Sequence, residues 1–314
     1  MAHARGARRT PSVRSSGKRA DSMTPKAYRR ALTVGLMVIL GWPPAAAAQA
    51  EERRYEGRTL SDWAHLLQDP DPSAQRKAVE ALRLGFEVQA VPVLNRAAET
   101  GVPSARIEAI RALAQIQPTA PETLATLSKA MRDTDPAVQR AAAAALGDLG
   151  AVSVLGQALK DPDKNVRRNA VRPLRRVVIR DRSSTATRAV VTALAEALRD
   201  PDGGIRRAAA SSLGAIGPEA VDAIPALAAT TMDPDPSVRN ATIEALGRIG
   251  SPAAVPVLVQ ALKDPRTGSL AVRALGNMGP PARGAIPALR EFQSQNGPSH
   301  TGEVEAAIKD IDRE

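Results

Sequence analysis

Small and apolar residues recur along one helical face in many short stretches of this chain. In residues 233–250 they occupy positions i, i+3, i+4, i+7, i+8 and i+11, as Val238, Ala241, Thr242, Ala245, Leu246 and Ile249. This spacing follows the 3.6-residue period of an α-helix and not the two-residue alternation of a half-buried strand. Residues 133–150 carry the same pattern. The pattern therefore predicts a series of amphipathic helices.

Start and stop signals flank these helices. Asp135-Pro136 and Asp235-Pro236 each place an N-cap carboxylate before a proline at the first helical position. At the other end stand glycines, which adopt the left-handed conformation that terminates many helices. These glycines are Gly150, Gly217, Gly250 and Gly279.

The same unit returns along the whole chain after residue 50. Strong copies occupy 133–150, 200–217 and 233–250, and weaker ones lie at 69–82, 100–113, 161–174, 264–279 and near the C-terminus. A second apolar helix precedes each copy, as in 151–161 and 254–264. About eight units of roughly 33 residues predict an all-α solenoid of stacked helix pairs.

The repeated pattern DPDPxVRxxAxxALGxxG resembles the bacterial HEAT-repeat proteins of the type related to phycobilisome lyases. The resemblance covers residues 59 to about 312. It implies a right-handed superhelical stack of about eight HEAT-like pairs, with the second helices lining the binding side. The resemblance specifies the fold more than the function, because such repeats serve many partners. We interpret the chain as a noncatalytic scaffold for protein binding. Residues 59–69 resemble the first helix of exported members, and Trp63 is expected to cap the end of the solenoid.

The first fifty residues change the meaning of the net charge. They hold nine bases and one acid, and so supply +8 of the chain's +10. From Met23 they have a basic start, an apolar centre at 31–40 and a small-residue end. Ala48 and Ala50 fit the −3 and −1 positions of a signal peptidase site, with cleavage before Glu51. Whether translation starts at Met1 or Met23 stays open.

Two parts of the chain follow from this pattern. Residues 1–50 are predicted to be an N-terminal extension and secretory signal, and residues 51–314 the solenoid. The apolar run spans about ten residues, whereas a membrane span needs roughly twenty, so a signal is favoured over an anchor. The mature protein is expected in the periplasm or outside the cell.

Composition disfavours catalysis. Cysteine is absent, and the chain has three histidines, His3, His65 and His300, too few and too scattered for a metal triad or a nucleophilic relay. We therefore expect no catalytic residue, metal or cofactor. The resemblance leaves a role as accessory to an enzyme or chromophore-handling system as an alternative. Binding of a nucleic-acid backbone ranks third, because aromatics are 2% of the chain and export separates the protein from the chromosome.

Charged residues at fixed repeat positions have a structural interpretation. An aspartate opens each turn, and an arginine follows it in several repeats; we expect them to form an ion-pair ladder between neighbouring repeats. The aspartates include Asp133, Asp161, Asp200 and Asp233, with Asp69 and Asp264 at the ends, and the arginines are Arg106, Arg167, Arg206 and Arg239.

One segment is strongly basic. Residues 164–207 hold twelve bases and four acids, which leaves the rest of the mature chain at −6. Like charges at helical spacing repel, so stability does not explain an arginine row. Pro173 is expected to bend the helix, and a 39-residue spacing from Asp161 to Asp200 predicts a longer loop near 180–185. The candidate binding residues are Arg168, Arg172, Arg175, Arg176, Arg180, Arg182 and Arg207.

Two interpretations of these arginines remain open. They are either a solvated face neutralised by acids of neighbouring repeats, or a site for another protein with an acidic surface. The oligomeric state is not indicated by the sequence.

Overall fold

The computed structural model describes residues 53–117, 120–180 and 183–313. The predicted signal peptide, with Ala48, Ala50 and Glu51 at its cleavage site, lies outside the described residues, as does Arg182. Residues from Arg53 onward form one compact unit.

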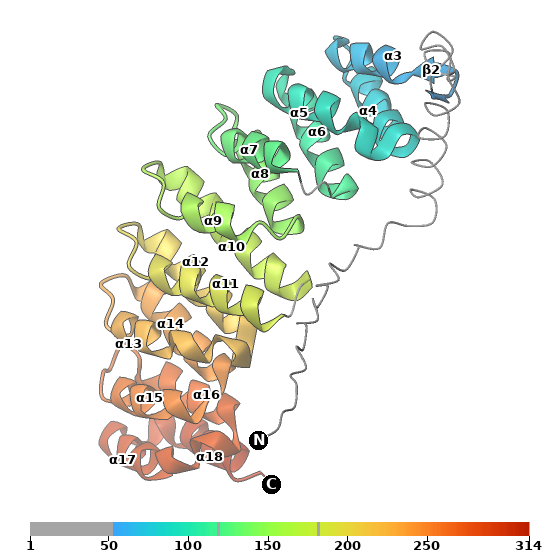
Figure 1. The fold of residues 1–314 in the computed structure, drawn as a ribbon. Helices are drawn as coiled ribbons and strands as arrows, with labels where there is room; N and C mark the ends of the chain where they lie inside the picture. Colours follow the sequence, from blue (N-terminus) through green and yellow to red (C-terminus); the bar gives the residue numbers. More distant parts are fainter. Residues whose placement is uncertain (1–52, 118–119, 181–182, 314) are drawn as a thin grey trace, which may run out of the picture. The chain divides into compact units, whose positions relative to one another are not determined.

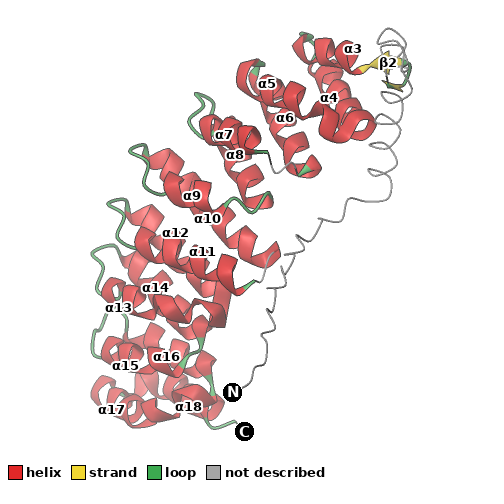
Figure 2. Cartoon of the chain, viewed as in Figure 1, coloured by secondary structure: helices red, strands yellow, loops and turns green. Residues whose placement is uncertain are grey.

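Helices arranged as consecutive pairs make up nearly all of this unit (Figures 1 and 2). The first helices of the pairs are α3 (Leu60–His65), α5 (Val91–Thr100), α7 (Pro121–Ala130), α9 (Val152–Ala158), α11 (Ser184–Ala197), α13 (Ile224–Thr230), α15 (Val255–Leu262) and α17 (Ile286–Asn296). The second helices are α4 (Pro72–Ala81), α6 (Pro103–Ile116), α8 (Pro136–Asp148), α10 (Lys164–Arg180), α12 (Gly203–Ile216), α14 (Pro236–Ile249), α16 (Gly268–Met278) and α18 (Thr301–Ile311). Eight pairs are thus present in the described residues, and the predicted all-α solenoid is confirmed.

The helix pairs pack in two layers, one of first helices and one of second helices. The second helices contact one another in succession from α4 to α18, and the first helices do so from α5 to α13 and from α15 to α17. Alanine, leucine, valine and isoleucine fill the core between the layers. Every helix therefore buries one face against its partner and another against the neighbouring repeat, as stacked repeats require.

Local signals begin and end the helices where the sequence predicted. Asp135 and Asp235 accept hydrogen bonds from the backbone N–H groups of Ala137 and Ser237. All four predicted stop glycines have positive φ, between 66° and 82°. Helix α6 ends instead at Gln117, which is left-handed at φ 55° without being glycine. That stop was not visible in the sequence, because a glutamine occupies the position.

A two-stranded antiparallel hairpin, β1 (Arg54–Tyr55) and β2 (Arg58–Thr59), precedes the first pair. Trp63 of α3 is buried beneath it, and its indole N–H donates to the Tyr55 carbonyl oxygen at 3.0 Å. The guanidinium of Arg58 lies 4.9 Å from the centre of the Trp63 ring, a cation–π distance. The hairpin and Trp63 together cover the apolar end of the first repeat.

Glycines on the second helices allow close approach between repeats. A Cβ at Gly214 would lie 2.7 Å from the Cα of Ala245, and one at Gly247 would lie 3.0 Å from the Cα of Ala274. Gly147 and Gly276 lie in the same way against the next second helix. The close contact between these neighbouring second helices therefore depends on the absence of a side chain at one repeat position.

Helix α10 differs from the prediction. The loop between α10 and α11 is no longer than the one between α8 and α9, so the predicted longer loop near 180–185 is wrong. The extra residues lengthen the helices instead: α10 has 17 residues against 13 in α8, and α11 has 14 against 7 in α9. Val177 and Val178 are buried, so the added turn of α10 packs against the core. The helix runs through Pro173, which lies against Gly147.

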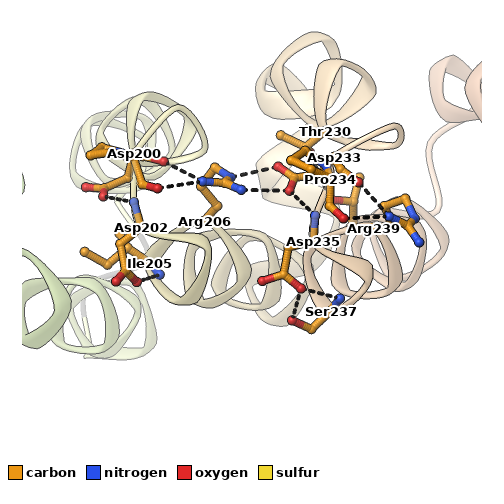
Figure 3. Close-up of polar contacts among 12 residues, drawn as sticks. Asp200, Asp202, Ile205, Arg206, Thr230, Asp233, Pro234, Asp235, Ser237 and Arg239 are labelled. Atoms are coloured by element: carbon orange, nitrogen blue, oxygen red, sulfur yellow. Dashed lines mark hydrogen bonds and ion pairs between the residues drawn. The ribbon is translucent and has the colours of Figure 1, made fainter.

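Ion pairs connect several neighbouring repeats. Arg206 donates from Nε and Nη2 to both carboxylate oxygens of Asp233 in the next repeat, at 2.7 and 2.8 Å, and from Nη1 to the carbonyl of Asp200 in its own turn (Figure 3). Arg167 makes the same bidentate contact with Asp200, at 2.7 and 3.1 Å, and Arg106 reaches Asp133 at 2.7 Å. The structure thus brings together the predicted partners at three repeat boundaries.

The predicted ladder includes neither a pair at Asp161 with the preceding repeat's arginine position nor a pair between Arg239 and Asp264. Gln139 occupies the arginine position before Asp161, and Asp161 pairs with Arg132 instead. Arg239 donates to the carbonyls of Asp233 and Pro234, and its Nε has no partner among the described residues (Figure 3). Asp264, the expected partner, is bound by Arg266 of its own shortened turn at 2.7 Å. The feature that these repeats share is therefore a side-chain hydrogen bond to a backbone carbonyl oxygen of the turn. Glutamine also donates this hydrogen bond, at Gln75 and Gln139.

Candidate binding groove

The arginine row of α10 lines one groove. Arg168, Arg172, Arg175 and Arg176 project into a cleft of about 830 Å³ that α10 forms with α8 and α12. Arg207 of α12 lines the same groove, as the sequence indicated. Arg180 lies in the adjoining groove between α6 and α8.

Arg140 of α8 also lines this groove, and sequence reasoning missed it. A signal was present: Arg140, Arg168 and Arg207 each stand seven residues after the aspartate that opens their turn. Because equivalent positions in stacked repeats lie side by side, a shared position predicts a shared surface. Six arginines therefore converge from three consecutive second helices.

Acids neutralise only part of this charge. A guanidinium nitrogen of Arg168 lies 3.3 Å from a carboxylate oxygen of Asp202. A carboxylate oxygen of Asp148 lies 3.2 Å from a guanidinium nitrogen of Arg176 and 3.8 Å from one of Arg180. Burial raises the pKa of Asp202, but the backbone N–H of Ile205 and the charge of Arg168 outweigh it, so its pKa lies below the usual value. The solvated-face interpretation thus accounts for these three arginines.

The remaining arginines lack a carboxylate partner. Within the part of the chain that the structure describes, four exposed arginines of the groove have no acid within ion-pair distance. These residues are Arg140, Arg172, Arg175 and Arg207. The described residues that line the groove include no acid. A site of this charge favours an anionic ligand.

The position of the groove has a cause in the sequence. Arg175 stands where the repeat pattern has the close-contact glycine, as in Gly147, Gly214 and Gly247. With an arginine at this position, α10 does not approach α12 through a glycine as α12 approaches α14 at Gly214, and the contact between α12 and α14 is the more extensive. Ala144, Ala208 and the 64% exposed side chain of Ile179 supply apolar surface beside the charges. The groove can therefore make both ionic and apolar contacts.

A family model for HEAT repeats matches residues 60–147, 152–232 and 224–308. The chain belongs to the HEAT-repeat family. HEAT repeats serve as scaffolds for protein interactions, and this membership indicates the same for the present chain. The finer resemblance to the phycobilisome-lyase type stays a prediction from the sequence.

Solved structures share the HEAT fold at low sequence identity. A chain of the structure describing Kap95p binding to RanGDP has a TM-score of 0.56 and 14% identity, and covers 93% of this chain and 45% of that one. Importin β has a TM-score of 0.50 and 16% identity, with 90% of this chain and 42% of that one covered. No curated protein sequence matches significantly. The solved structures thus establish the fold and leave the partner to be inferred from the groove.

Elsewhere in this HEAT-repeat protein, polar clusters do not form a relay. The Nδ1 atom of His300 lies 3.4 Å from Ser269 Oγ and 3.6 Å from Glu303 Oε2. Both contacts use the same ring nitrogen, whereas a Ser-His-acid relay needs one partner on each. His65 has no clustered ligand, since no group of three potential metal ligands occurs among the described residues. None of the helices in that part of the chain is both long and apolar enough to cross a membrane.

Proposed function

We propose that this protein is an exported, noncatalytic scaffold that holds an acidic protein partner in the groove of α8, α10 and α12. The observation that supports this most directly is the set of four exposed arginines without carboxylate partners, Arg140, Arg172, Arg175 and Arg207. Guanidinium groups bind carboxylates through paired N–H donors, which adds geometric specificity to the charge attraction. The export part rests on the leader pattern of residues 23–50.

The composition of the groove favours a protein over a nucleic acid. The described part of its lining contains alanine, isoleucine and proline but no aromatic ring on which a base could stack. Apolar side chains of a partner can instead contact Ala144, Ala208 and Ile179 while its carboxylates meet the arginines. Like most interfaces, this one would have apolar contacts surrounded by polar ones.

Reversing three unpaired charges is expected to abolish partner capture. Arg172→Glu, Arg175→Glu and Arg207→Glu change exposed side chains that make no ion pair within the described residues, so folding should be retained. Tagged full-length protein would be produced in its native cells, and the captured proteins identified by mass spectrometry. We expect acidic partners to fall at least tenfold in the triple variant, with an unchanged circular dichroism spectrum.

A matched control uses three exposed arginines outside the grooves. Arg273, Arg283 and Arg290 likewise make no ion pair among the described residues. Their reversal to glutamate changes the net charge equally and should leave capture intact. If both triple variants lost partner capture equally, or if neither lost it, the groove would not be the site that binds the partner.

Export gives a separate prediction. N-terminal sequencing of the mature protein is expected to begin at Glu51, because Ala48 and Ala50 provide the small residues that signal peptidase requires. Ala50→Leu should leave the unprocessed form in the membrane fraction, whereas Ala46→Leu, outside the −3 and −1 positions, should be processed normally. Mature protein that retains residues before Ala48 would contradict the cleavage site.

A further inference from the structure

The arginine groove continues into two others along the second helices. Between α6 and α8 lies a groove of about 590 Å³, and between α4 and α6 one of about 270 Å³. Arg140 and Ala144 line both the first and the second groove, and Arg111 and Gln115 line both the second and the third. The three grooves thus form one continuous trough from α4 to α12.

We propose that this trough binds an extended acidic polypeptide segment of about twelve residues. The inference rests on the proposed function and names the form of the partner. Neighbouring packed helices lie roughly 8–10 Å apart, so the four steps from α4 to α12 span about 32–40 Å. An extended chain advances about 3.3 Å per residue, and ten to twelve residues cover that length.

The width of the trough favours a single chain. Its grooves have the volumes of small-ligand clefts, each of which accommodates a few side chains. The linings of the grooves extend over five consecutive second helices, which suits a long, narrow ligand better than one compact domain. An extended segment presents alternate side chains to the trough and can reach each groove in turn.

The charge along the trough selects the ligand further. Beyond the first groove, Arg76 and Arg83 line the groove between α4 and α6 and make no ion pair with any residue that the structure describes. Acids also line the trough at intervals, as Glu80, Glu108 and Asp148. A uniform polyanion, such as a nucleic-acid backbone, would be repelled at each of these points. A peptide can place apolar side chains there, beside Ile107, Ala114 and Ala141.

A length series of peptides tests the proposal on the full-length chain. Fluorescent peptides of the repeat Glu-Thr-Val-Thr would be made with 4, 8, 12 and 16 residues, so that glutamate and valine alternate on the face presented to the trough. Threonine and valine favour extended backbone. Fluorescence anisotropy should show affinity rising with each step up to 12 residues and then levelling, with the 12-residue peptide at least a hundredfold tighter than the 4-residue peptide. Raising the salt concentration should weaken binding, because several ion pairs form.

Variants separate the two ends of the trough. Arg76→Glu with Arg83→Glu should weaken the 12-residue peptide about tenfold and leave the 4-residue peptide unchanged. The α10-groove triple variant should weaken both peptides, and the Arg273, Arg283 and Arg290 triple variant neither.

Other results of these binding experiments would contradict different parts of the proposal. Equal affinity for 4 and 12 residues, with no effect at Arg76 and Arg83, would overturn the extended mode while leaving a compact acidic-partner site intact. Capture of acidic folded proteins without binding of any peptide would also overturn it. A twelve-nucleotide single-stranded DNA binding as tightly as the 12-residue peptide would overturn the choice of polypeptide. Failure of the groove triple variant to alter peptide binding or partner capture would remove the proposed function itself.

Discussion

Replacing Arg206 by glutamine is expected to destabilise the protein by about 2–3 kcal/mol. Arg206 and Asp233 are 15% and 6% exposed at their side chains and form a bidentate pair across a repeat boundary. Glutamine can still donate to the Asp200 carbonyl, but it leaves the Asp233 carboxylate largely buried without its counter-charge. Removing one partner of a buried pair costs several kcal/mol, and partial exposure reduces that figure here. Equilibrium urea unfolding would measure the loss.

Arg239 provides the matched control for this substitution. It occupies the same repeat position and is buried, but it contacts carbonyl oxygens and no carboxylate in the described residues. Gln75 and Gln139 already make the equivalent carbonyl contact at their positions, both at 2.7 Å. Arg239→Gln should therefore cost about 1 kcal/mol or less, because glutamine keeps the carbonyl contact and removes a buried Nε that has no partner among the described residues. Equal effects at Arg206 and Arg239 would refute the assignment of stability to the inter-repeat pair.

Lowering the pH should remove the stability that the Arg206–Asp233 ion pair contributes. The side-chain hydrogen bonds from Arg206 lower the pKa of Asp233 below its ordinary value of 3.8, against burial, which raises it. A carboxyl whose pKa is lower in the folded state stabilises the fold above its unfolded pKa and loses that effect as the pH falls through the folded pKa. The stability difference between the natural protein and Arg206→Gln should thus be constant above about pH 5 and shrink below about pH 4. A difference that persists to pH 2 would contradict the ionic origin.

Much of the fold was predictable because it is set by local and periodic signals. Helical spacing, Asp-Pro starts and glycine stops act within one repeat, and their recurrence specifies the stack. Exceptions arose where tertiary packing replaced a local signal. Gln117 ends α6 without a glycine, and burial of Val177 and Val178 extends α10 past the position where a glycine ends other second helices. The Asp264–Arg266 pair forms within one turn, which a pattern of neighbouring repeats could not indicate.

The candidate site was predictable in part. Helical spacing placed Arg168, Arg172, Arg175 and Arg176 on one face, and the structure places them in one groove. Which of them have carboxylate partners depends on distances between repeats, and these distances are set by packing. Arg168 pairs with Asp202, the N-cap residue of α12, and Arg176 pairs with Asp148 of α8. Arg172 and Arg175 pair with no acid among the described residues. The separation into structural and free charges therefore required the structure.

Gly214→Ala is expected to destabilise the protein by about 2–3 kcal/mol through overpacking. The new Cβ would lie 2.7 Å from the Cα and 3.0 Å from the Cβ of Ala245 on α14. Because a backbone atom cannot rotate away as a side chain does, α12 and α14 must separate along their contact. Repeats interact only with their neighbours, so the damage should be local. Hydrogen exchange should show loss of protection in α12 and α14 first, with α4 and α6 little changed.

The same substitution at Gly156 should have the opposite effect. Gly156 lies within helix α9, and a Cβ there would meet no atom within 4 Å. Alanine is favoured over glycine in a helix interior by roughly 0.5–1 kcal/mol, so Gly156→Ala should raise the free energy of unfolding by about that amount. The pair thus distinguishes a glycine required by contact from one that is dispensable. If both alanine variants were stabilised, the close approach of α12 to α14 would not depend on Gly214. The physical explanation for the groove at Arg175, which replaces that glycine in α10, would then fail as well.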